Sequence, residues 1–297
     1  MGGKTARIKG DLDDVEALLE ILNILKDVSS NKFYAFVKTK TDFSKFLEIF
    51  LYFFDMLELV DTECPLIRNS NPSHDLMLVT SEAGFMSQLN SRVCNTALKE
   101  AQSFSDVRIA CVGQRGAEKA ISLGLKVEKI FNMVEETGRY ESAMKIRDYL
   151  VERVMSGQSG GCRIVYVWPK SFNILKPRVV KLLPASELLG REEDFQFTEE
   201  EKKTILAKSH FIRESKIDSI MKILADLWVS ARIFEILTDT KLAEAATQAQ
   251  QLEQAVESLG GEKKSLTLSF KKASREELNK AMQEVFTSSK MTSRKGR

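Results

Sequence analysis

Two long stretches at the ends of this chain contain no proline. All five prolines lie between Pro65 and Pro184, so residues 11–64 and 191–297 lack the residue that most strongly breaks a helix. The first stretch also lacks glycine, and the second lacks glycine as far as Leu259. Two helices of this length, rising about 1.5 Å per residue, would extend roughly 80 and 100 Å, far beyond a compact domain. The sequence therefore predicts two helical arms.

The first arm carries apolar residues at the spacing of a coiled coil. Counting in sevens gives two rows, of which eleven of fourteen positions are apolar. The first row is Val15, Leu22, Ser29, Phe36, Phe43, Phe50 and Leu57, and the second is Leu18, Leu25, Lys32, Thr39, Phe46, Phe53 and Val60. The polar exceptions Ser29, Lys32 and Thr39 fall together, which predicts a looser seam or a polar neighbour there.

The second arm repeats the same spacing in two blocks. The blocks are Ile217, Ile220, Leu224, Leu227, Ala231 and Phe234, and then Leu242, Ala245, Ala249, Leu252, Val256 and Leu259. Between them two steps of four residues form a stutter, which locally unwinds a supercoil. The simplest arrangement pairs the arms with each other in an antiparallel coiled coil. The alternative is that both helices pack on the surface of the domain between them.

The middle of the chain alternates strand and helix patterns. Strands are predicted over residues 76–80, 107–112, 125–131, 162–168 and 179–183, and helices over 91–103, 117–123 and 139–155. This order predicts a small doubly wound, Rossmann-like α/β domain. The predicted fold is thus a long antiparallel coiled coil of N- and C-terminal helices flanking an α/β domain. We expect the boundaries at 1–64, 65–190 and 191–297, the last part including a basic tail.

Several kinds of chemistry find little support in the sequence. A net charge of +2 does not indicate the strongly positive surface that binds nucleic acid. The four cysteines are scattered singly and, with only two histidines, form no metal-binding motif. Gly113 and Gly116 lie between a strand and a helix, as in a phosphate loop, but a GxxG spacing more often makes a turn. We expect no catalytic residue, cofactor or metal, no transmembrane segment, and a flexible exposed loop over residues 156–161.

Three segments of the middle domain resemble the gamma subunit of the rotary F-type ATP synthase. Residues 78–91 are similar to the family's strand-turn signature: Ser81, Glu82, Gly84, Asn90 and Ser91 fit, while Met86 and Ser87 replace the usual Cys and Gly. The strand end from Val112 to Gly116 and the Leu182-Leu183-Pro184 run are also similar to that family. The resemblance makes Ser81, Gly84, Asn90, Gly113 and Gly116 turn positions of the family motif.

The end of the chain is similar to the family's last helix. Residues 266–285 keep the order of residue types of that helix, but Ser274-Arg275 replaces an Arg-Gln pair and Asn279 replaces a Thr. By resemblance, Ser274, Arg275 and Asn279 would contact a loop of a catalytic subunit, with an altered contact here. The family's first helix is basic near its start, whereas this one carries Asp11, Asp13, Asp14, Glu16 and Glu20. This charge reversal implies that the facing surface has changed as well.

The resemblance implies a rotor shaft that performs no bond chemistry. Its expected partners are the alpha and beta catalytic subunits, an epsilon/delta-type stalk subunit and the membrane c-ring. It would be a peripheral membrane protein on the cytoplasmic face of a bacterial plasma membrane, or on the matrix or stromal face of an organelle. Two alternatives stay open: a gamma-like subunit of a specialised rotary ATPase, and a coiled-coil scaffold whose α/β head binds a ligand.

Overall fold

The structure is a computed structural model. It describes residues 3–56, 63–84, 86–132, 138–185 and 215–294, with side chains for all of these except 39, 41–56 and 288–294. The chain divides into two units, one of residues 1–30 with 248–297 and one of residues 31–247. The predicted domain boundaries at 64 and 190 fall at residues outside or bordering the described ranges, and they stay predictions.

The larger unit holds one sheet of five strands. The strands are β1 (Ser73–Val79), β2 (Asp106–Val112), β3 (Val127–Phe131), β4 (Gly161–Ser171) and β5 (Ile174–Leu183), in the order β3-β2-β1-β4-β5. The first four run parallel, whereas β5 returns antiparallel to β4 as a hairpin. All five predicted strands are confirmed. Strand β5 begins five residues before the predicted Val179, and this first half was missed because Lys176, Pro177 and Arg178 interrupt its apolar pattern.

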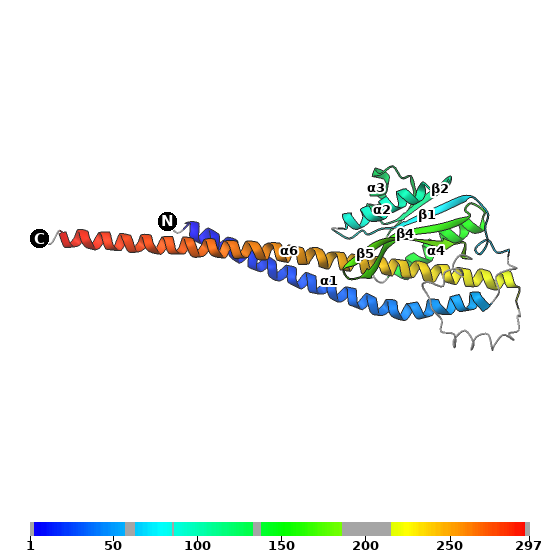
Figure 1. Cartoon of the computed structure of the whole chain (residues 1–297), viewed down its shortest axis with the longest axis horizontal. Helices are drawn as coiled ribbons and strands as arrows, with labels where there is room; N and C mark the ends of the chain where they lie inside the picture. Colours follow the sequence, from blue (N-terminus) through cyan, green and yellow to red (C-terminus); the bar gives the residue numbers. More distant parts are fainter. Residues whose placement is uncertain (1–2, 57–62, 85, 133–137, 186–214, 295–297) are drawn as a thin grey trace. The chain divides into compact units, whose positions relative to one another are not determined.

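Helices cover both faces of this sheet, as Figure 1 shows. On one face lie α2 (Ser87–Ala101) and α3 (Gln114–Ser122), and on the other lie α4 (Arg139–Met155) and the first part of α6 (Ile217–Arg294). Strand β1 serves both layers: Leu76 and Leu78 join the α2 core, while Met77 and Val79 join the α4 core. Residues 76–79 of β1 are apolar and buried on both faces, as expected of a parallel strand between two layers of helices, which confirms the doubly wound prediction.

The long helix α6 has 78 residues and is continuous through Gly260 and Gly261. Its stretch beside the sheet is buried nearly all round, with Trp228 1% exposed. The prediction that Leu227 lies in the seam is wrong, because Leu227 is 46% exposed and its neighbour Trp228 fills the core instead. Here the helix packs on the α/β domain, as in the alternative arrangement, because a helix that is apolar on all sides needs cover on all sides.

The helix α1 (Gly3–Met56) confirms one predicted heptad row and corrects the other. Partly or fully buried side chains recur at Ile8, Leu12, Val15, Leu19, Leu22, Lys26, Ser29, Phe33, Phe36 and Lys40. The row of Val15 is therefore right, whereas its companion row runs through Leu19 and Lys26 rather than Leu18 and Leu25. Leu18 and Leu25 are 44% and 46% exposed. The rows beyond Lys40 lie outside the described side chains.

In the smaller unit, α6 shows the matching pattern. Its partly or fully buried residues, spaced by three and four, are Ala249, Leu252, Val256, Leu259, Lys263, Leu266, Phe270 and Ala273. Lys263 Nζ lies 3.1 Å from Glu16 Oε1 of α1. The predicted second block is thus confirmed and continues four steps beyond Leu259, since the glycines there lie within the helix without ending it. From Ser274 to Thr287 every residue is exposed.

The predicted flexible loop at residues 156–161 is only partly a loop. Gly161 opens β4, and Ser159 and Gly160 are buried. The backbone N–H of Gly160 donates to Ser73 O at 2.6 Å, and Asn71 Nδ2 donates to Gly157 O at 2.6 Å. Glycine at position 160 lets the backbone pass close to Asn71, because a Cβ on Gly160 would lie 1.9 Å from the Asn71 carbonyl oxygen.

Candidate interaction surfaces

The three predicted contact residues lie together on the end of α6. Ser274, Arg275 and Asn279 are all exposed. At helical spacing Ser274 lies one turn from Leu278, and Arg275 lies one turn from Asn279 and two from Met282. Leu278, Met282 and Phe286 are 61%, 63% and 68% exposed. The end of α6 therefore presents an apolar stripe with one cation and two small polar groups beside it.

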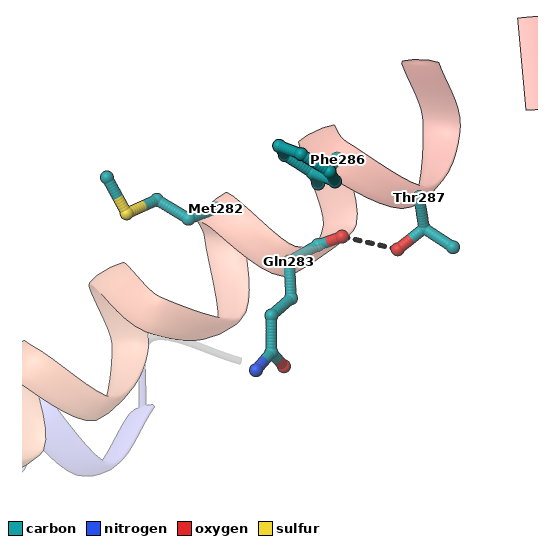
Figure 2. Close-up of a pocket in the computed structure, with 4 residues that line it drawn as sticks. All are labelled: Met282, Gln283, Phe286 and Thr287. Atoms are coloured by element: carbon teal, nitrogen blue, oxygen red, sulfur yellow. Dashed lines mark hydrogen bonds between the residues drawn. The ribbon is translucent and has the colours of Figure 1, made fainter. Parts of the chain in front are cut away.

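Figure 2 shows the outer part of this stripe, where Met282, Gln283, Phe286 and Thr287 line a shallow open pocket. The Thr287 hydroxyl donates to the Gln283 carbonyl oxygen. All four residues belong to one helix, so the pocket has no opposite wall of its own. Such a surface is suited to contact with another protein rather than to enclosing a small molecule.

The predicted turn after β1 is held by a reciprocal pair of hydrogen bonds. The backbone N–H of Ser81 donates to Asn90 Oδ1 at 2.8 Å, and Asn90 Nδ2 donates to Ser81 O at 2.8 Å. The Ser81 hydroxyl also accepts from the N–H of Ala83 at 3.1 Å. Both residues are buried, so they satisfy each other in a place without water. Gly84, in contrast, is exposed, with nothing within 4 Å of where a Cβ would be.

The two glycines of the GxxG turn allow a close approach to Thr80. Gly113 has a φ of 100°, and a Cβ on Gly116 would lie 1.8 Å from Thr80 Oγ1. The N-terminus of α3, where a phosphate would bind, is met by the Glu82 carboxylate: Oε1 accepts from the N–H of Gln114 at 2.8 Å. A carboxylate there stabilises the helix end. This geometry favours the turn over the phosphate loop. The sequence analysis names Glu82 only as part of the strand-turn signature and gives Thr80 no role beyond ending a strand, because neither residue belongs to the GxxG spacing.

The titratable groups inside the larger unit are poorly suited to catalysis or to metal binding. All four cysteines are buried and free. Burial raises the pKa of the Cys94 thiol to about 11 and that of Cys111 to about 12, so both are protonated at neutral pH and are weak nucleophiles. Among the described residues, no group of three or more His, Cys, Asp or Glu side chains could hold a metal ion. The described helices likewise include none that combines the length and the hydropathy needed to cross a bilayer.

A buried ion pair joins α1 to α6 beside the sheet. Lys40 Nζ of α1 lies 2.6 Å from Asp239 Oδ1 of α6, and Tyr166 of β4 donates to Asp239 Oδ2 at 3.5 Å. Asp239 is 1% exposed. Burial raises the pKa of this carboxyl to about 6, even though Lys40 opposes the shift. The pair explains why a lysine occupies the apolar seam of α1 at this point.

This carboxyl should make folding stability depend on pH. Because its pKa is raised in the folded protein, the folded state binds the proton more tightly, so the stabilisation is complete below the unfolded pKa and is lost as pH rises through about 6. We expect the Asp239 contribution to fall by about 1 kcal/mol between pH 5 and 7. Denaturant unfolding of the wild type and Asp239→Asn across this range measures it. Identical pH slopes for the two proteins would contradict the assignment.

Comparison with known proteins identifies the family of the chain. The ATP synthase family profile matches residues 4–290. The ATP synthase gamma chain of Desulforudis audaxviator (strain MP104C) is 21% identical over 226 residues, which cover 76% of this chain and 77% of that protein. The gamma chain of Helicobacter pylori (strain P12) is 23% identical over 215 residues, covering 71% of this chain and 69% of that one.

Solved structures give the same fold. A chain of the Tetrahymena thermophila mitochondrial ATP synthase central stalk and c-ring aligns with a TM-score of 0.57 at 15% identity, over 79% of this chain and 99% of that chain. A rotor chain of the Euglena gracilis mitochondrial ATP synthase aligns with a TM-score of 0.59 at 13% identity, over 93% of this chain and 99% of that chain. With the family profile extending over nearly its whole length, the chain belongs to the ATP synthase gamma-chain family.

Proposed function

We propose that this chain is the turning shaft in the central stalk of a rotary ATP synthase. It would couple ion flow through a membrane ring to ATP synthesis or hydrolysis in a surrounding ring of alpha and beta subunits. The observation that supports this role is the matched seam of the smaller unit, where α1 and α6 bury side chains at alternating spacings of three and four. Helices interlocked in this way resist twisting, because neither can rotate without displacing the other.

The shaft would act without making or breaking bonds. The groups whose pKa values are strongly raised by burial are all inside the larger unit, where a substrate could not reach them: Cys94, Cys111, Cys162, Tyr166 and Asp239. Its contribution would be asymmetry: a shaft with unlike sides presses on the three catalytic sites differently as it turns. The sites would then pass in turn through binding, synthesis and release.

The exposed end of α6 is the part proposed to contact the alpha and beta subunits. Its apolar stripe around Met282 and Phe286 would slide against them as a bearing, and Ser274, Arg275 and Asn279 would meet a catalytic-subunit loop. The α/β domain would face the c-ring and an epsilon/delta-type subunit. This arrangement makes the chain a peripheral protein on the cytoplasmic face of a bacterial membrane, or on the equivalent organellar face.

The proposed contact of the α6 stripe with the catalytic subunits can be tested by introducing acidic residues into it. In the purified native complex, Arg275→Glu and Met282→Asp should each lower steady-state ATP turnover several-fold, since one reverses a charge and the other places a carboxylate on an apolar contact. Lys280→Glu, on the opposite side of the same exposed helix, is the matched control and should change turnover little. Equal effects at all three positions would argue against a contact specific to this stripe.

The alternative of a scaffold with a ligand-binding head makes a different prediction. Calorimetric titration of the isolated chain with ATP and ADP would then show tight binding, whereas the shaft role predicts none. The Glu82 carboxylate at the start of α3 favours the shaft, because it would repel a phosphate there. A gamma-like subunit of a specialised rotary ATPase remains a variant of the same proposal. Its support is the replacement of the family's Arg-Gln pair by Ser274-Arg275.

A further inference from the structure

Three side chains of α1 within the larger unit lie on one face of the helix. Phe33, Phe36 and Lys40 follow one another at spacings of three and four, which places them on the same side. Phe33 is 5% exposed and the other two are partly buried, whereas Tyr34 between them is 65% exposed. We call this set of three residues the α1 contact face. Each of its side chains connects α1 to a different part of the α/β domain.

Phe33 contacts the turn between β4 and β5. Its ring meets that of Phe172 edge to face, with the centroids 5.0 Å apart and the planes at 87°. This is a geometry that aromatic pairs favour. Leu242 and Ala246 of α6 are buried in the same small core, and Leu175 of β5 packs against it. The β4–β5 turn, α1 and α6 are therefore held together in one core.

Phe36 contacts the first residue of α4. The guanidinium carbon of Arg139 lies 4.8 Å from the centroid of the Phe36 ring and 5.9 Å from that of the Phe234 ring in α6. A guanidinium over an aromatic face is attracted by the electrons of the ring, and the attraction is strongest where water is excluded. A single side chain of the α/β domain thus contacts both long helices.

Lys40 adds a polar connection to strand β4. Its ion pair with Asp239 of α6 is shielded from water, and Tyr166 of β4 donates to the same carboxylate at 3.5 Å. Unlike an apolar contact, the ion pair restricts movement in every direction, because Nζ must stay within hydrogen-bond distance of Oδ1. Rolling α1 about its axis would break this pair and separate both aromatic contacts at once.

We propose that the α1 contact face is the joint through which the α/β domain turns α1 together with α6. The proposal rests on the shaft role and adds the residues that connect the domain to the shaft. Helix α6 packs directly against the sheet and moves with it, whereas α1 would follow the domain through these three contacts. Weakening them would leave the two main cores of the domain intact, because Phe33, Phe36 and Lys40 belong to neither core.

Hydrogen exchange in the native complex tests the contacts of the joint. The double variant Phe172→Ala and Arg139→Ala removes both aromatic contacts from the side of the α/β domain. We expect the backbone amides of residues 31–40 to exchange about tenfold faster, because local opening becomes easier where contacts are lost, while those of β1 stay unchanged. The matched control is Tyr140→Ala with Ile174→Ala. These two residues are close in sequence to the changed ones but are 64% and 45% exposed, so exchange should stay as in the wild type.

A substitution on α1 itself gives a second variant for the same measurement. Phe36→Leu keeps an apolar side chain but removes the ring that Arg139 covers, so we expect a smaller increase in exchange, about threefold, at the same amides. Unchanged exchange at residues 31–40 in both variants would overturn the proposal. Faster exchange throughout the α/β domain would overturn it as well, because the contacts would then hold the domain together rather than attach α1 to it.

Torsional stiffness tests the joint itself. With the catalytic subunits of the native complex immobilised and a bead attached to the α/β domain, the angular fluctuation of the bead without ATP measures how firmly the domain is connected to the shaft. In the Phe172→Ala and Arg139→Ala double variant we expect the variance of the bead angle to rise about twofold, because one helix instead of two would then carry the twist. The Tyr140→Ala and Ile174→Ala control should match the wild type.

An unchanged variance in the double variant would contradict the joint even if hydrogen exchange becomes faster. Failure of the shaft role gives a different result, because ATP would then not turn the bead even in the wild type. The exchange measurement would still show in that case whether the α/β domain holds α1 through these contacts.

Discussion

Replacing Gly116 by alanine should lower the free energy of unfolding of the α/β domain by about 3 kcal/mol or more. The added Cβ would lie 1.8, 2.4 and 2.5 Å from Oγ1, Cβ and Cγ2 of Thr80. Rotation of Thr80 cannot relieve this overlap, because its Cβ is itself involved and its hydroxyl donates to Val112 O at 2.6 Å. Denaturant unfolding followed by circular dichroism measures the loss.

Two further variants show whether the overlap is the cause. Gly261→Ala is the matched control: nothing lies within 4 Å of its Cβ position, so alanine should stabilise α6 by up to about 1 kcal/mol. Removing the Thr80 side chain with Thr80→Gly in the Gly116→Ala background should recover part of the loss. A Gly116→Ala protein as stable as the wild type would show that α3 is not packed against Thr80 as described.

Replacing Arg153 by methionine should cost about 3–5 kcal/mol of folding stability. Arg153 Nε donates to both carboxylate oxygens of Asp75 at 3.0 Å, and Nη1 donates to Gln158 Oε1 at 3.0 Å. The Asp75 side chain is 3% exposed, so without Arg153 its charge would be left buried and unpaired. Thermal or denaturant unfolding at neutral pH would show this as a lower transition midpoint.

Comparison with a more exposed pair isolates the effect of burial. Arg147 binds Asp226 at 2.7 Å, but that carboxylate is 34% exposed, so Arg147→Met should cost only about 1 kcal/mol. In the Arg153→Met background, Asp75→Asn should restore much of the stability by removing the stranded charge. Similar losses for Arg147→Met and Arg153→Met would contradict the role given to burial.

The elements of the α/β domain could be predicted from sequence because each has a strong local signal. The second half of β1, residues 76–79, is a continuous apolar run that is followed by a turn, and α4 has the predicted limits, from Arg139 to Met155. The start of β5 was missed, since Lys176 and Pro177 have no strand pattern and are held only by pairing with β4. That pairing depends on residues distant in sequence.

The second row of the α1 seam shows why a heptad pattern can be assigned one residue out. A row through Val15 and Leu22 has possible companions at Leu18 and Leu25 or at Leu19 and Lys26, and hydropathy alone favours the first. The structure takes the second, which leaves Leu18 and Leu25 exposed. The row through Leu19 and Lys26 also includes Lys40, and only the packing of α1 against α6 explains a lysine there, because Lys40 pairs with Asp239 of α6.

The candidate contact residues illustrate a different limit. Ser81 and Asn90 could be selected from a motif, and their mutual hydrogen bonds give the motif a physical reason. The bond from Gln114 N–H to Glu82 joins two turns 32 residues apart, which no local pattern encodes. In the structure Ser274, Arg275 and Asn279 are exposed near the end of α6. Their contact with a catalytic subunit stays a prediction.

Rotation of the chain inside its complex is the most direct test of the shaft role. The native cysteines are buried, so an exposed Gln102→Cys would be the preferred site for attaching a bead to the α/β domain. With the complex immobilised through its catalytic subunits, we predict that ATP drives the bead around in one direction and that rotation stops when ATP is removed. A complex that hydrolyses ATP at full rate while the bead stays still would contradict the account.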